Sequence, residues 1–134
     1  MKQRSLSGKM RSNKVKLYFE VLKMKHEYLD YIKKESAGTE YEVSDTVLDF
    51  TDQILSILHH QPKNIYPTGR NSIQLEYESV ICTKDEPEEY YLEFEIFEDY
   101  VNIYQDLNLE ETEIEDATIE DLIYYSDEFC RRFP

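Results

Sequence analysis

Hydrophobic residues recur at helical spacing in three parts of the chain. Intervals of three and four residues place these side chains on one face of a helix. Ser44 or Asp45 can cap the second of these segments, and Thr118 with Asp121 has the spacing of a capping box at the start of the third. The pattern predicts helices at 13–35, 44–60 and 118–132.

Stretches of alternating apolar and polar residues lie between the second and third predicted helices. This period of two predicts strands at 72–82 and 90–98, and a third strand at 101–107. The polar loop Thr83–Glu89 would join the first two strands as a long hairpin. The very acidic stretch 108–117 reads as a solvated loop.

The order of predicted elements is therefore α-α-β-β-β-α. One antiparallel sheet with an apolar face has to be covered by amphipathic helices, which indicates an α+β fold with the helices on one face. The 134 residues are enough for one domain with its own core. We assign residues 13–134 to a single domain and the polar, basic residues 1–12 to a disordered arm.

Charge divides the chain into two unequal parts. Residues 1–35 hold 10 Lys or Arg and 4 Asp or Glu, a net +6, whereas residues 36–134 hold 5 and 25, a net −20. The acidic body should be repelled by nucleic acid and by anionic lipid. It should attract a basic protein partner, and the two opposite charges also make a homo-oligomer plausible.

Neither cysteine usage nor apolar stretches point to export or to a membrane. The two cysteines, Cys82 and Cys130, lie in apolar patterns and are interpreted as buried thiols. The basic start is not followed by the apolar segment of a secretory signal. We therefore expect a cytoplasmic protein.

Carboxylates gather on one face of the predicted hairpin. Gln74, Glu76 and Glu78 alternate with apolar residues on one strand, and Glu93 and Glu95 do so on the next. Like charges opposite each other destabilise a sheet. Such a face is either well solvated, docked on a basic protein surface, or bound to a divalent cation.

Arg70 is one of only five basic residues after position 35. It ends the turn Pro67–Arg70 just before the first predicted strand. Its side chain would either form an ion pair with a nearby carboxylate or contact a binding partner.

Sequence motifs of the common catalytic classes are absent. The chain has three glycines and neither a phosphate-binding glycine-rich loop nor a G-x-S-x-G nucleophile motif. We therefore expect no catalytic residue, no cofactor and no resident metal.

The two strands together carry a distinctive motif, PTGRNSIQLEYE from Pro67 followed by YLEFEIFE from Tyr91. It resembles a group of small bacterial proteins with a "PTGRxSIQxEYE…YLExEIFE" hairpin, for which we know no established activity. The resemblance implies a bacterial or mobile-element origin and an accessory protein rather than a housekeeping enzyme.

These observations favour a non-catalytic acidic interaction module that binds a basic partner, as antitoxin, immunity or defence-associated proteins do. The predicted partner-binding residues are Arg70, Gln74, Glu76, Glu78, Glu93 and Glu95. Two alternatives stay open: a divalent-metal-dependent enzyme or regulator that uses carboxylates of this face, and a subunit of a homo- or hetero-oligomer.

Overall fold

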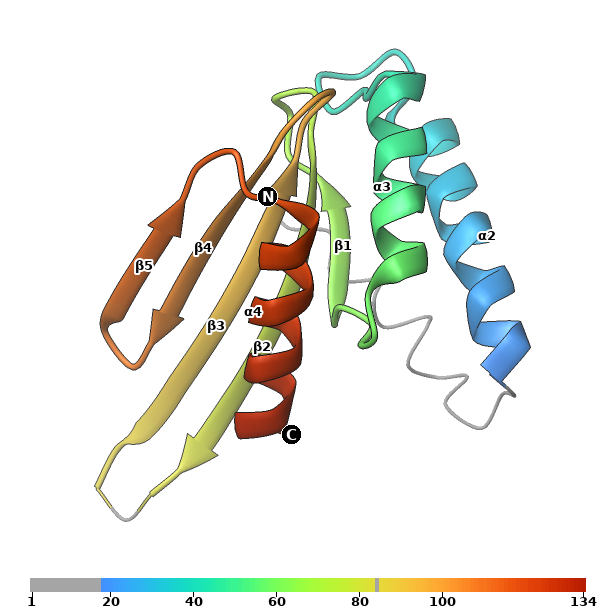
Figure 1. Cartoon of the computed structure of the whole chain (residues 1–134). Coiled ribbons are helices and arrows are strands. Elements are labelled where there is room, and N and C mark those ends of the chain that lie inside the picture. The colour runs from blue at the N-terminus through green and yellow to red at the C-terminus, as the bar shows by residue number, and fades with distance from the viewer. Residues whose placement is uncertain (1–17, 84) are drawn as a thin grey trace.

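The structure is a computed structural model that describes residues 18–83 and 85–134. Their elements follow the order α-α-β-β-β-β-β-α, so the predicted α+β class is confirmed (Figure 1). The predicted basic arm at 1–12 and the predicted helix start at Asn13 lie outside the described residues.

The three described helices occupy the predicted segments. They are α2 (Tyr18–Ser36), α3 (Asp45–Ile57) and α4 (Ile119–Arg132). The Ser44 side chain caps α3 by accepting from the Val47 amide at 3.3 Å. Thr118 and Asp121 form the predicted capping box of α4, each side chain accepting from the other's backbone amide. Helix α3 ends three residues earlier than predicted.

The sheet is larger than the sequence pattern indicated. Its strands run antiparallel in the order β1-β2-β3-β4-β5. Strands β2, β3 and β4 are the predicted ones, and β1 and β5 were not predicted. Their bounds are β1 (Asn64–Pro67), β2 (Ile73–Cys82), β3 (Pro87–Ile96), β4 (Val101–Leu107) and β5 (Glu110–Ile114).

The prediction that 108–117 is a loop was wrong, because β5 lies within it. This strand is at the sheet edge and carries Glu110, Glu111 and Glu113, and glutamate is depleted in strands generally. Strand β1 has only four residues and ends in Pro67, which a sheet tolerates at its edge. Both strands are therefore short edge strands with weak local signals.

One face of the sheet forms the core with all three described helices. From β2 and β3 it contributes Ile73, Leu75, Leu92, Phe94 and Ile96, each with no exposed surface. The helices cover this face with apolar side chains that belong to the same cluster, among them Leu29, Ile32, Val47, Ile54, Leu55, Leu122 and Phe129. The opposite face of the sheet is therefore the side away from the helices.

The β2–β3 hairpin extends past the ends of the neighbouring strands (Figure 1). Its connecting loop is shorter than predicted, because β2 continues to Cys82 and β3 begins at Pro87. Cys82 is consequently exposed, and its prediction as a buried thiol was wrong, while Cys130 is partly buried. Among the described helices, none is long and apolar enough to cross a membrane.

Candidate functional site

The face of the sheet turned away from the helices is polar on all five strands. We call it the polar sheet face. Strand alternation and register assign to it Asn64, Tyr66, Gln74, Glu76, Glu78, Tyr91, Glu93, Glu95, Asn102, Tyr104, Asp106, Glu111 and Glu113. In the central hairpin, Glu76 lies opposite Glu93 and Gln74 opposite Glu95, so the carboxylates of the two strands do lie on one face.

Glu76 is the most buried carboxylate of this face, with none of its surface exposed. Two donors come from β1: the Asn64 amide lies 3.1 Å from Oε1, and the Tyr66 hydroxyl lies 2.7 Å from Oε2. The Tyr91 hydroxyl donates to Oε2 from the other neighbouring strand. A buried charge is tolerated when several donors surround it, so these contacts allow Glu76 to sit inside the sheet surface.

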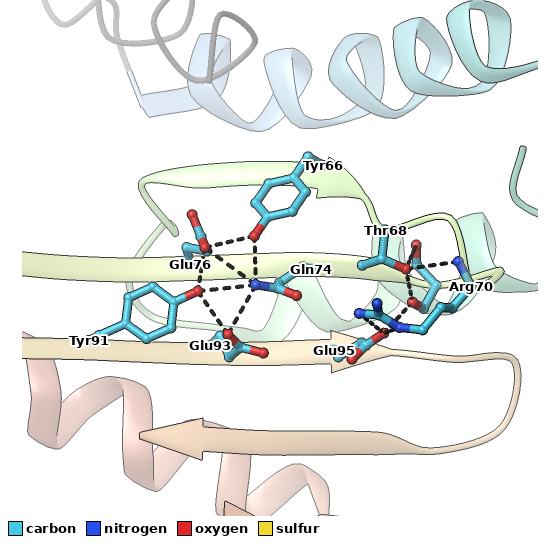
Figure 2. Close-up of polar contacts among 9 residues, drawn as sticks. Tyr66, Thr68, Arg70, Gln74, Glu76, Tyr91, Glu93 and Glu95 are labelled. Atoms are coloured by element: carbon cyan, nitrogen blue, oxygen red, sulfur yellow. Dashed lines mark hydrogen bonds and ion pairs between the residues drawn. The ribbon is translucent and has the colours of Figure 1, made fainter. Parts of the chain in front are cut away.

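Gln74 connects the same groups laterally. Its amide nitrogen lies 2.6 Å from the Tyr66 hydroxyl, and 3.1 Å from both the Tyr91 hydroxyl and Glu93 Oε1. The Tyr91 hydroxyl oxygen also lies 2.8 Å from Glu93 Oε1, so its single proton lies between the two carboxylates. Figure 2 shows these side chains converging from β1, β2 and β3. We call the group Asn64, Tyr66, Gln74, Glu76, Tyr91 and Glu93 the buried polar cluster.

The two tyrosines of the cluster are held as neutral donors. Burial, followed by the hydrogen bond to Glu76, raises the pKa of Tyr66 well above its ordinary value of 10.0. The same causes, together with the charge of Glu93, raise the pKa of Tyr91 further. Both hydroxyls therefore keep their protons at neutral pH, which explains how two glutamates tolerate facing positions on adjacent strands.

Arg70 and Glu95 form a separate group at the end of the strands (Figure 2). Arg70 Nε and Nη2 each lie 2.9 Å from Glu95 Oε2, and the Ser72 hydroxyl donates to the same oxygen at 2.6 Å. Thr68 Oγ1 accepts from the Arg70 amide at 3.1 Å and fixes the turn. The sequence allowed the Arg70 side chain either an ion pair with a nearby carboxylate or a contact with a binding partner. The structure contains the ion pair.

Beyond the cluster, the polar sheet face opens to solvent over β4 and β5. The Tyr104 hydroxyl donates to Glu111 at 2.5 Å, and this hydrogen bond raises the pKa of Tyr104 to about 12. A hollow of about 250 Å³ lies between these strands and β3, lined in part by Glu93, Glu95 and Glu113. The exposed carboxylates of β5 thus extend the acidic surface away from the hairpin.

The predicted site residues divide into three sets. Gln74, Glu76 and Glu93 meet in the buried polar cluster, and Arg70 pairs with Glu95. Glu78 stands apart and lies 3.8 Å from the Lys63 ammonium. Of the three alternatives for this face, solvation does not describe Glu76, because side chains from both neighbouring strands enclose it.

Sequence reasoning missed the donors that surround Glu76. Asn64 and Tyr66 lie on the unpredicted β1, so nothing placed them beside β2. Tyr91 alternates with Glu93 and Glu95 along β3, and that alternation was a usable signal for its place on the polar sheet face. In residues 18–83 and 85–134, no three His, Cys, Asp or Glu side chains form a group suited to a metal ion.

Comparisons with known proteins give no relative to guide the assignment. No protein-family profile, no curated protein and no solved structure matches this chain. The function is therefore argued from the geometry of the polar sheet face.

Proposed function

We propose that this protein is a non-catalytic interaction module whose polar sheet face binds a basic surface of a partner protein. The net −20 of residues 36–134 and the carboxylates of this face favour an antitoxin, immunity or other defence-associated role, in which a basic partner would be neutralised by being covered.

The buried polar cluster is the observation that carries the proposal. Its hydrogen bonds fix Glu76 and Glu93 in the sheet, and Tyr91 and Gln74 are fixed with them. A binding surface whose side chains are already ordered loses less conformational entropy when a partner docks. The cluster would thus act as a rigid base for the exposed carboxylates around it.

The surrounding charges give the surface its preference for a cation-rich partner. Glu78, Glu111 and Glu113 lie on the same face as the cluster. Residues 36–134, which contain the whole face, carry a net −20. A negative field of this extent speeds association with a basic protein and repels nucleic acid phosphates.

Affinity capture with the full chain tests the proposal. The tagged protein is incubated with nuclease-treated bacterial lysate at low and high salt, beside two variants of equal charge. One variant changes Glu78, Glu111 and Glu113 to Gln on the polar sheet face. The control variant changes Glu35, Glu40 and Glu120 to Gln as well. These three residues are exposed and lie on or beside the helices.

We expect a basic protein to be recovered by the wild type and the control at low salt. The face variant should recover at least about tenfold less of it, because the charge on this face attracts and orients the partner. Equal loss in both variants would show that only net charge matters. No loss in either would show that the face is not the binding surface.

A further inference from the structure

Strand β2 is only partly covered at its outer edge. Strand β1 pairs with its first residues, Ile73 to Glu76. From Tyr77 to Cys82, β2 pairs with β3 on one side, and no strand of the described chain pairs with it on the other. This part of the hairpin is the segment that extends past the neighbouring strands (Figure 1).

The direction of the backbone groups follows from one hydrogen bond. The Lys63 amide donates to the Glu76 carbonyl at 2.6 Å, so the main chain of Glu76 faces the outer edge. Backbone groups alternate sides along an antiparallel strand, and the β2–β3 register continues without interruption to Cys82. The N–H and C=O groups of Val80 and Cys82 therefore also face outward.

The two ends of the sheet differ in how their edges are protected. The edge strand β5 carries Glu110, Glu111 and Glu113, and charged side chains discourage the addition of another strand. Along the open part of β2, Val80 is 58% exposed and Ile81 is 42% exposed. An edge with apolar side chains and outward backbone groups is a template for strand addition.

A hollow beside this edge indicates which side chains an added strand would carry. It measures about 410 Å³ on the polar sheet face, and its lining includes Val80, Glu89, Tyr91 and Asp106. The stem of a lysine or arginine opposite Val80 would lie against the Val80 side chain, with its charge toward Glu89, which is paired with Val80 on β3. On the opposite face, an apolar side chain of the same strand would lie beside Ile81.

We propose that the outer edge of β2 at Val80–Cys82 binds an extended partner segment in which basic and apolar residues alternate. The segment would pair with β2 as an additional antiparallel strand. This inference rests on the proposed function and names the part of the basic partner that would contact β2. A second copy of the chain fits less well, because self-pairing about Val80 would bring together two bodies that each carry a net −20.

Amide hydrogen exchange of the full chain, followed by NMR, tests the assignment. The probe is a short peptide in which lysine and valine alternate. The matched control is the same peptide with its lysine backbone nitrogens methylated, which keeps the charge and removes the donors that would face β2. We expect only the unmethylated peptide to slow exchange at Val80 and Cys82, by at least about tenfold.

A pair of variants makes the test independent of charge. Val80→Pro removes an outward N–H that β3 does not use, whereas Val80→Thr keeps it. The readout is the Cys82 amide, because proline leaves no amide proton at position 80. The proline variant, shown to be folded by its NMR spectrum, should lose the protection of the Cys82 amide, and the threonine variant should retain it.

Three results would overturn the edge assignment. They are equal binding of both peptides, absence of binding by either, and protection that grows with protein concentration alone. Both peptides could bind equally and in a salt-sensitive way, and the variant with Glu78, Glu111 and Glu113 changed to Gln could abolish that binding. This result would leave the proposed function standing. If the edge stayed protected and that variant had no effect, the result would count against the polar sheet face as the binding surface.

Discussion

The buried polar cluster makes a sharp prediction for Glu76→Gln. The substitution keeps the size of the side chain and removes its charge. Glutamine offers one acceptor oxygen in place of two. If that oxygen replaces Oε2, it retains the donors Tyr66 and Tyr91, but the new amide group then faces the Asn64 amide, which is itself a donor.

The expected loss of stability follows from these contacts. Hydrogen bonds to a charged group contribute about 1.5–3 kcal/mol and neutral ones about 0.5–1.5 kcal/mol, and a stranded buried donor costs about 1–3 kcal/mol. Removing the negative charge opposite Glu93 relieves a repulsion that lowers the free energy of unfolding by only a few tenths of a kcal/mol. We expect the free energy of unfolding to fall by about 2 kcal/mol.

Urea unfolding at neutral pH, followed by circular dichroism, measures this change. With a urea dependence of about 1–3 kcal/mol per molar for a protein of this size, the midpoint should fall by about 1 M. Glu113→Gln is the matched control, because Glu113 is exposed on the same face. That variant should stay within about 0.5 kcal/mol of the wild type.

A result in the opposite direction would refute the reasoning. If Glu76→Gln were as stable as the wild type, the negative charge of Glu76 would not be what organises its neighbours. If Glu113→Gln lost as much stability as Glu76→Gln, the effect would come from the overall charge and not from the cluster.

Four further predictions concern stability. Because the pKa values of Tyr66 and Tyr91 are raised in the folded protein, the stability they contribute is complete below pH 10.0 and falls as the pH rises above it, since the unfolded chain loses those protons first. Urea unfolding should show a fall of up to about 1.4 kcal/mol per pH unit for each tyrosine. The fall should become less steep when both are changed to Phe, and the part that remains comes from Tyr77 and Tyr104, whose pKa values are also raised. Arg70→Ala removes an ion pair whose arginine is 60% exposed and should cost less than about 1 kcal/mol in the same assay, with a smaller difference at high salt; a larger loss would contradict this. Leu109→Gly should raise the free energy of unfolding by about 0.5–1 kcal/mol, because Leu109 has φ 78° and is 88% exposed; a loss would mean that its side chain makes a stabilising contact. Thr118→Ala removes the cap of α4 and should lower the free energy of unfolding by about 1 kcal/mol, which a lower melting temperature would show. Thr118→Ser keeps the capping hydroxyl and should leave the melting temperature unchanged.

Local patterns were enough to predict much of the fold. The helical periodicity placed α3 and α4 to within a few residues, because each helix turns one apolar stripe toward the core. The alternation in β2 and β3 predicted both strands and which of their side chains face the core, because one face of this hairpin is buried and a slip by one residue would expose it.

The edges of the sheet could not be predicted in the same way. Strands β1 and β5 are short, and their residues are proline, asparagine and glutamate as often as strand-forming types. Their pairing depends on the neighbours β2 and β4, which supply the backbone partners. The order of apolar and polar residues along the chain does not specify which strands pair at the edges of the sheet.

The candidate site shows the same division. By itself, the sequence determined that Gln74, Glu76 and Glu93 share a face of one hairpin, because side chains alternate with a period of two. The tertiary structure decided that Glu76 is buried there, because Tyr66 on β1 and Tyr91 on β3 reach it from either side. Lateral neighbours in a sheet come from strand pairing, so the donors that stabilise this carboxylate appear only once the chain is folded.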